Sequence, residues 1–302
     1  MFYSKASLLL QKGGIVVQNA IVKALIKEEQ IRLYFIDNSQ LLRDIYALNQ
    51  ELPKPLKLLL GKTISAMSIL SGTLKGNQRM SLQVTLSNTR HKIFAEAEAN
   101  GNVRGYLNEE LLRSSNIEEK SMQDLIGPSG MIRVIKGSEM NQFTSITDMP
   151  NQHITDDIAN YFVQSDQTPT YLYSDIQLDK GGFLLSSYAL YAQLLPGAPP
   201  QLLSEVKMIV KANPDIFSKL NAEEASDSEE ALTQLFGDAK IIGHSYSQFF
   251  CGCSKEMFYG MLYSLSEEEI KRSIERKEDI EALCHICGKT YRFEQKEMQQ
   301  LF

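Results

Sequence analysis

The chain has 302 residues, 43% of them hydrophobic and 23% charged, which is typical of a globular protein long enough for two or more domains. No apolar run approaches the roughly 20 residues that span a bilayer, and the short run at residues 8–10 lacks the cleavage pattern of a signal peptide. We therefore expect a cytoplasmic protein with no membrane partner. The net charge of −6 arises from residues 221–302, which carry 16 acidic and nine basic side chains. Because nucleic-acid-binding modules need a basic surface, we expect no nucleic-acid partner either.

The first predicted elements are a β-hairpin and two helices. Residues 21–26 and 31–36 are rich in β-branched and aromatic side chains and flank a charged turn. Asn38 then offers an N-cap for a helix with apolar residues at helical spacing. A second helix, over residues 55–74, mixes apolar with small side chains, and this composition predicts close packing against a sheet or another helix.

Strand patterns dominate the middle of the chain, with one helix among them. The strands are predicted at 80–86, 92–97, 103–107, 130–136, 143–146 and 168–178, and the helix at 154–164. This order fits an α+β fold with a mostly antiparallel sheet and packed helices. The segment has neither a glycine-rich phosphate loop nor a nucleophile elbow, and we expect His91 and His153 to be isolated surface residues. These observations predict a protein that is not an enzyme.

The next segment, residues 185–236, is predicted to be a helical linker. It follows Gly181 and Gly182, contains a turn-forming run at 194–200, and continues in helical patterns of apolar residues. Because it is too apolar to be solvated on its own, we expect it to lie on the first domain. The chain thus divides into an N-terminal α+β core domain at 1–184, the linker at 185–236 and a small C-terminal domain at 237–302.

The C-terminal domain contains every cysteine of the chain, in two close pairs, Cys251 with Cys253 and Cys284 with Cys287. In a reducing compartment, such pairs indicate metal or redox chemistry rather than a permanent disulfide framework. Zinc takes four tetrahedral ligands, and four thiolates make a closed structural site. We therefore predict a Zn²⁺ site formed by these four residues, to which His285 is not a ligand.

Around the cysteines, the sequence predicts helices over 254–265 and 266–276, and a turn with a short strand over 288–293. A domain of this size needs a metal to supply the stability that its core lacks. A structural zinc site can contribute about 10–16 kcal/mol, so loss of the metal is expected to unfold the domain. Four thiolates on one metal are also oxidisable, which would make the site a reversible order-to-disorder switch.

Other interpretations of the cysteines compete with this one. A thioredoxin-like site would place the Cys-x-x-Cys pair at the start of a helix, whereas here the pair runs into a turn and a strand. A zinc ribbon for nucleic acid would need a basic surface. A plain structural zinc module, without a switch, is compatible with the spacing alone.

Over roughly residues 20–302, the chain resembles the family of redox-regulated heat-shock holdases of about thirty-three kilodaltons. The resemblance rests on the two cysteine pairs with thirty residues between them, and on Gly288, Tyr291 and Phe293 after the second pair. Further motifs of that family are found in the N-terminal domain and linker, at residues 102–106, 181–183 and 193–198.

The resemblance implies an ATP-independent molecular chaperone that is inactive while reduced and zinc-bound. Oxidation would pair Cys251 with Cys253 and Cys284 with Cys287, release Zn²⁺, and unfold the C-terminal domain and the linker. Apolar surface would then bind unfolded client proteins and prevent their aggregation, and the oxidised form would be a homodimer. The alternative is a zinc-stapled protein-interaction or regulatory module without chaperone activity.

The sequence departs from the family pattern in three places. Residues 87–91 stand where the family has a glycine-rich turn, residues 186–192 resemble an insertion, and about seventeen residues form an extra tail at the start. We expect these differences to affect the surface of the N-terminal domain and the choice of client, but not the switch.

Overall fold

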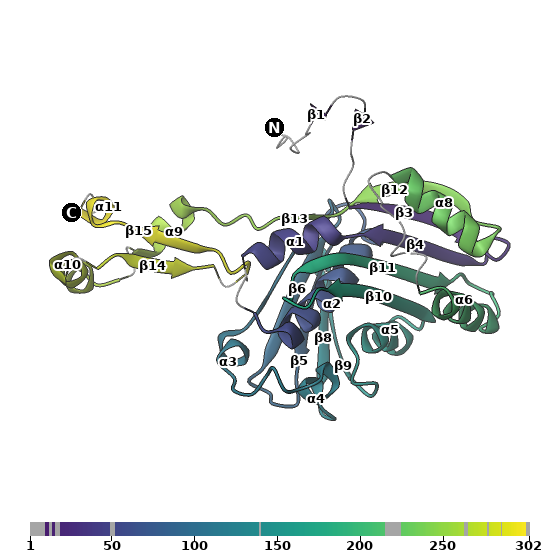
Figure 1. Cartoon of the computed structure of the whole chain (residues 1–302), viewed down its shortest axis with the longest axis horizontal. Coiled ribbons are helices and arrows are strands. Elements are labelled where there is room, and N and C mark those ends of the chain that lie inside the picture. Colours follow the sequence, from purple (N-terminus) through teal and green to yellow (C-terminus); the bar gives the residue numbers. More distant parts are fainter. Residues whose placement is uncertain are drawn as a thin grey trace.

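A computed structural model describes residues 10–11, 14–15, 19–48, 52–138, 140–214, 225–262, 265–276, 278–284 and 286–299. Most of the predicted N-terminal tail, and His285, lie outside these residues, although a short ribbon of β1 (Leu10–Gln11) and β2 (Gly14–Ile15) is described. In Figure 1, two sheets with helices form the main body, and a smaller unit that carries the C-terminus projects to one side. Among the described helices, none is both long and apolar enough to cross a membrane.

Two sheets form the main body. The five-stranded sheet has the order β10–β11–β4–β3–β12, with β3 (Ala20–Ile26), β4 (Ile31–Asp37), β10 (Thr170–Leu178), β11 (Leu184–Leu194) and β12 (Lys240–Tyr246). The six-stranded sheet has the order β13–β7–β6–β5–β8–β9, with β5 (Arg79–Thr85), β6 (Lys92–Glu98), β7 (Asn102–Leu107), β8 (Met131–Ser138), β9 (Asn141–Asp148) and β13 (Gln248–Phe249). Neighbouring strands are antiparallel except for β13 and β7. The predicted α+β class is confirmed, but the strands divide between two sheets rather than one.

Helix α2 (Lys54–Ser71) lies in the core between the sheets, where it contacts β6 and β7 of one and β10 and β11 of the other. Its small residues permit this approach, since a methyl group at Gly61 would collide with the Tyr46 hydroxyl and Ser65 Oγ lies 3.1 Å from Ser187 Oγ. The predicted helix and its close packing are confirmed. The other helices of the main body are α1 (Ser39–Ala47), α3 (Glu109–Leu112), α4 (Met122–Ile126) and α5 (Ile154–Ser165).

Helix α1 begins directly after Asn38, as predicted, but the Asn38 side chain does not cap it. Its Nδ2 instead donates a hydrogen bond of 2.8 Å to Ser68 Oγ on α2, while Ser39 N donates to Asp37 Oδ1 at 2.9 Å. Asn38 is 0% exposed, and a buried amide is stabilised only where it finds a partner. The predicted capping role was therefore wrong, because tertiary contact with α2 supplied that partner.

Helices α6 (Gln201–Ala212) and α8 (Ala225–Phe236) cover one face of the five-stranded sheet (Figure 1). Their buried residues Val206, Val210, Leu232 and Phe236 join one apolar cluster with the strand residues Val22, Ile26, Ile31, Leu33 and Phe35. The prediction that these helices lie on the first domain is confirmed. Packing of this kind removes apolar side chains of both layers from water, at about 25 cal/mol per Å².

The structure differs from the predicted linker at its start. Residues 185–194 are not part of a connection but belong to β11, which pairs with β10 on one side and β4 on the other. The predicted insertion at 186–192 therefore lies inside a central strand. Such a strand is buried on both faces and lacks the alternation of polar and apolar residues by which strands are recognised.

The unit at the C-terminus is built from α9 (Lys255–Leu262), α10 (Glu267–Arg276), β14 (Ile280–Leu283), β15 (Thr290–Phe293) and α11 (Gln295–Met298). The two predicted helices and the strand after Gly288 are confirmed. Its small core gathers two of the cysteines with six large side chains, which are those of Phe258, Leu262, Ile270, Tyr291, Phe293 and Met298. This core is far smaller than that of the main body, in keeping with the prediction that the unit needs further stabilisation.

Candidate metal centre

The two cysteine pairs lie in different local structures. Cys251 and Cys253 belong to the extended segment between β13 and α9, whereas Cys284 and Cys287 lie in the turn that joins β14 to β15. In that turn, the backbone N–H of Gly288 donates to the Cys284 carbonyl at 2.8 Å, and the N–H of Cys284 donates to the Lys289 carbonyl at 2.8 Å. Gly288 has φ of +78°, a conformation that glycine adopts without strain, so the turn can bring both sulfurs to one side.

The four sulfur atoms converge. All lie within 4.8 Å of one another, with 3.7 Å between the Sγ atoms of Cys251 and Cys284 and 3.5 Å between those of Cys253 and Cys287. A tetrahedral zinc ion with Zn–S bonds of about 2.3 Å would separate its sulfur ligands by about 3.8 Å. The donor set and its spacing thus fit a zinc ion, and the structure brings together all four residues that the sequence singles out.

The site is sheltered on one side. Cys284 and Cys287 are each 2% exposed, whereas Cys251 and Cys253 are half-buried. The rings of Phe258 and Tyr291 pack at 5.1 Å between centroids with a tilt of 33°, and both residues belong to the cluster that contains the cysteines. An apolar environment strengthens the attraction between a metal cation and its thiolates, while the half-buried pair leaves the site open to small solutes.

The surroundings shift the pKa values of three of the thiols in different directions. Burial raises the pKa of Cys251 to about 11 and also raises the pKa of Cys287, so both favour the neutral form in the absence of metal. For Cys253, burial acts in the same direction, but hydrogen bonds from Tyr291 and the neighbouring thiols outweigh it and lower the pKa. Cys253 is therefore better suited than Cys251 or Cys287 to begin as a thiolate, and a bound zinc ion would hold all four thiols deprotonated.

Tyr291 is a contributor to the site whose role the sequence did not predict. Its hydroxyl lies 3.1 Å from Cys253 Sγ and 3.0 Å from the Cys253 carbonyl oxygen. A hydroxyl has one proton, so it can donate to only one of these acceptors at a time. In either arrangement it orients Cys253 toward the other sulfurs.

Replacing Tyr291 by phenylalanine is expected to weaken zinc binding by about 10-fold, because groups that orient metal ligands have effects of that size. Zinc affinity would be measured by competition with a coloured chelator under reducing conditions. Tyr246→Phe is the matched control, since Tyr246 is 53% exposed at the end of β12 and does not belong to the apolar cluster that contains the cysteines. An affinity that falls equally in both variants, or in neither, would contradict this role of Tyr291.

The segment that leads to Cys251 is attached to the edge of the six-stranded sheet. Strand β13 pairs in parallel with Asn102 and Val103 of β7, and the N–H of Phe250 donates to the Val103 carbonyl at 3.1 Å. Phe249 contacts both the main core and the small C-terminal core. The first cysteine pair therefore begins one residue beyond a hydrogen-bonded attachment to the main body.

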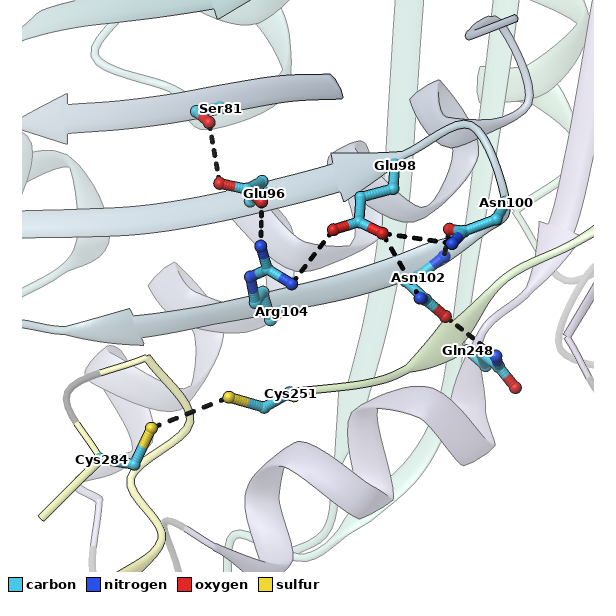
Figure 2. A network of polar contacts seen from close by, with 9 residues as sticks. All are labelled: Ser81, Glu96, Glu98, Asn100, Asn102, Arg104, Gln248, Cys251 and Cys284. Carbon is cyan, nitrogen blue, oxygen red and sulfur yellow. Dashed lines mark hydrogen bonds and ion pairs between the residues drawn. The ribbon is translucent and has the colours of Figure 1, made fainter. Parts of the chain in front are cut away.

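Polar side chains reinforce this attachment (Figure 2). Gln248 Nε2 donates to Asn102 Oδ1 at 2.9 Å, and Asn102 Nδ2 donates to Glu98 at 3.4 Å. Glu98 also accepts from Arg104, at 3.3 Å, and the guanidinium of Arg104 forms a second ion pair with Glu96. These contacts link β6, β7 and the arriving segment, so a displacement of the cysteine-bearing segment disturbs the sheet edge.

Replacing Gly101 by alanine is expected to loosen the attachment. Gly101 has φ of +87°, and an added Cβ would overlap the carbonyl of Tyr246, where the chain crosses toward β13. The conformation alone costs about 1–2 kcal/mol in a residue with a side chain, and the overlap adds to this. Faster amide hydrogen exchange at residues 246–250 would report the effect.

Gly76→Ala is the control for that experiment. Gly76 also has positive φ, +59°, but nothing lies within 4 Å of an added Cβ, so it isolates the conformational cost from the overlap. Unchanged exchange at 246–250 in the Gly101 variant would show that the crossing does not depend on this glycine.

Comparison with known proteins places the chain in a family. The family model described as "Hsp33 protein" matches residues 19–294. A "33 kDa chaperonin" of Oceanobacillus iheyensis is 27% identical over 291 residues, covering 94% of this chain and 99% of that protein. Another, of Halalkalibacterium halodurans, is 28% identical over 93% of this chain and 98% of that protein. The fold is similar to the crystal structure of the 33 kDa chaperonin from Thermotoga maritima, with a TM-score of 0.74 at 17% identity, over 94% of this chain and 97% of that one. The chain therefore belongs to the Hsp33 family.

Proposed function

We propose that this protein is a redox-regulated, ATP-independent chaperone that holds unfolded proteins after oxidation. The observation that carries the proposal is the convergence of Cys251, Cys253, Cys284 and Cys287 within 4.8 Å, in a family whose similar members are named as chaperonins. In the reduced protein, the four thiolates would hold Zn²⁺ and keep the C-terminal unit folded. A closed site of four sulfurs has no position for substrate, so the metal supplies stability rather than catalysis.

We also propose how the chain divides into an N-terminal domain, a connection and the cysteine-bearing unit. We assign residues up to Leu194, which form α1 to α5 and all strands of the two sheets except β12 and β13, to the N-terminal domain, and α6 and α8 to a connection that lies on it. Strands β12 and β13 then return to the two sheets before the cysteine-bearing unit begins. A change at the cysteines can thus reach α8 through a chain segment that is paired with both sheets.

Oxidation by hydrogen peroxide would convert the four thiolates to two disulfides and release Zn²⁺. Two molecules of peroxide accept four electrons from the thiolates and four protons from the solvent and yield four molecules of water, while Cys251 pairs with Cys253 and Cys284 with Cys287. The sulfur distances of 3.7 Å from Cys251 to Cys284 and 3.5 Å from Cys253 to Cys287 run between the pairs, so pairing within each pair rests on the family resemblance. Mass mapping of peptides from the oxidised protein distinguishes it from pairing of Cys251 with Cys284.

Loss of the thiolates would unfold the C-terminal unit. A structural zinc site contributes about 10–16 kcal/mol, which matches or exceeds the stability of a whole small domain, about 5–15 kcal/mol. Release of β12 and α8 would follow, since both are joined to that unit by a continuous short segment. The apolar face now covered by α8, including Val22, Ile26 and Phe35, would become available to unfolded clients. Exposed apolar surface of this kind also favours the proposed homodimer of the oxidised form.

The proposal is tested by titrating the reduced, zinc-loaded protein with peroxide. Zinc release, free thiols and the light scattering of an aggregating client would be followed together. We expect one zinc ion to be released per chain as scattering falls. Zinc release without any effect on aggregation would favour an interaction module stapled by zinc, and retention of zinc would exclude the switch.

A further inference from the structure

The outer face of the six-stranded sheet carries a groove that the proposed switch does not use. Strand register places Arg133, Gln83, Phe94 and Tyr106 in one row across β8, β5, β6 and β7. The next row holds Ile135, Ser81, Glu96 and Arg104. Both rows face away from α2, whose contacts are with the opposite side of the sheet.

Between these rows lies a cavity of about 270 Å³. Its floor contains the rings of Phe94 and Tyr106, which stack at 4.8 Å between centroids with 14° between their planes. Ile135 adds an aliphatic wall, and the ion pair of Glu96 with Arg104 forms a polar rim. Binding sites for small molecules usually have about 300–1,000 Å³, so this volume suits one or two side chains of a polypeptide.

One residue of the cysteine-bearing turn already lies at this groove. Ile286, between Cys284 and Cys287, is among its lining residues and is 43% exposed. Figure 2 shows the turn with Cys284 beside the strand that carries Arg104. Ile286 thus forms part of the wall of the groove, and it comes from the turn whose shape the thiols determine.

The adjacent edge strand offers backbone groups as well. Strand β7 runs from Asn102 to Leu107, but its pairing with β13 covers only Asn102 and Val103. The chain itself therefore adds a short extended segment to this edge, and the pairing ends beside the groove. An edge strand with an apolar pocket next to it is the arrangement by which sheets accept extended peptides.

We propose that the edge of β7 together with this groove, here called the β7 acceptor site, binds an extended apolar segment of an unfolded client. Backbone hydrogen bonds along β7 do not depend on the client's sequence, while the groove receives an aliphatic or aromatic side chain in the space that Ile286 borders. The site rests on the proposed function, since Ile286 leaves only when the four-thiol arrangement is lost. The site is separate from the apolar face beneath α8, which lies on the other sheet.

Site-specific photo-crosslinking tests the acceptor site in the full-length protein. A benzophenone amino acid would replace Tyr106 in the groove, and the control would carry it at Phe183, which is 72% exposed and lies outside the groove. The probe is a reduced and alkylated, permanently unfolded protein with a fluorescent label. We expect the oxidised chain to crosslink at least about 5-fold more from position 106 than from position 183, and the reduced chain to show no such difference.

Two outcomes distinguish a failure of the β7 acceptor site from a failure of the proposed function. Equal crosslinking from both positions, in oxidised protein that still suppresses aggregation, would overturn the acceptor site alone. An oxidised wild-type chain that does not suppress aggregation, together with an oxidised position-106 variant that does not crosslink, would overturn the proposed function and this site together.

A second pair of variants tests the role of Ile286 without oxidation. Ile286→Ser would remove one wall of the groove and widen it while leaving the thiols in place, and Leu283→Ser is its match on the same hairpin, with 41% exposure and no part in the groove. The contact of a partly buried isoleucine with the groove contributes about 1 kcal/mol, and serine does not make this contact. Because the probe then no longer competes with Ile286, reduced Ile286→Ser is expected to bind the probe about 5-fold more tightly than wild type. If the two variants bind the probe equally and contain equal amounts of zinc, Ile286 does not cover the groove as proposed.

Discussion

Replacing Cys284 and Cys287 together by serine is expected to reduce zinc content from one ion per chain to nearly none. Two of four ligands are lost, and with them the metal's contribution of about 10–16 kcal/mol to folding. Both positions are 2% exposed, so each serine would also bury a hydroxyl at a cost of about 1–3 kcal/mol where it finds no partner. We therefore expect the C-terminal unit to be unfolded in this variant and client aggregation to be suppressed without oxidant.

Zinc analysis and amide hydrogen exchange would check this result. Exchange should become fast over residues 251–299 and remain slow in β3, β4 and α2, whose core does not include the cysteines. Met261→Ser is a suitable control, because Met261 is 57% exposed on α9 within the same unit. If the double variant still binds one zinc ion per chain, Cys284 and Cys287 are not required as ligands, and the expectation is contradicted.

Replacing Leu232 by alanine is expected to detach α8 from the five-stranded sheet. Leu232 is 0% exposed and packs in the cluster with Val22, Ile31 and Phe35. Truncation of a buried leucine costs about 2–5 kcal/mol through lost transfer energy and the remaining cavity. Since α8 covers the face proposed to bind clients, the variant should suppress aggregation at lower peroxide concentration than wild type.

The measurement combines the peroxide titration with hydrogen exchange over residues 225–236. Gln234→Ala is the matched control, because it alters the exposed side of the same helix. If α8 exchanges faster in the Leu232 variant while the peroxide requirement is unchanged, the covering of this face would not be what keeps the protein inactive.

The two proposed client sites differ in how they are covered. The face beneath α8 is closed by an extensive apolar layer, and its release needs the loss of a whole helix. The β7 acceptor site is closed by two residues of β13 and by Ile286, all of them close to the cysteines in sequence. We expect the acceptor site to open first as oxidation proceeds, because fewer contacts hold it closed.

Local patterns in the sequence determined much of this protein. The hairpin at 21–36, the small residues of α2 and the helices at 201–212 and 225–236 all follow from side-chain periodicity, which depends on neighbours along the chain. The residues of the proposed metal site could be singled out from their scarcity alone, since these four are all the cysteines of the chain. Zinc chemistry then restricted the kinds of site that they could form.

Tertiary structure decided how these parts are joined. Strand β11 is buried on both faces, and β13 has only two residues, so neither carries a periodic signal that identifies a strand. The return of β12 and β13 to different sheets, the hydroxyl of Tyr291 at Cys253 and the position of Ile286 over the groove depend on contacts between residues far apart in the chain. The sequence thus determined the cysteine centre, whereas the fold decided which surfaces that centre can cover, because strand pairing between distant segments is not encoded in any local pattern.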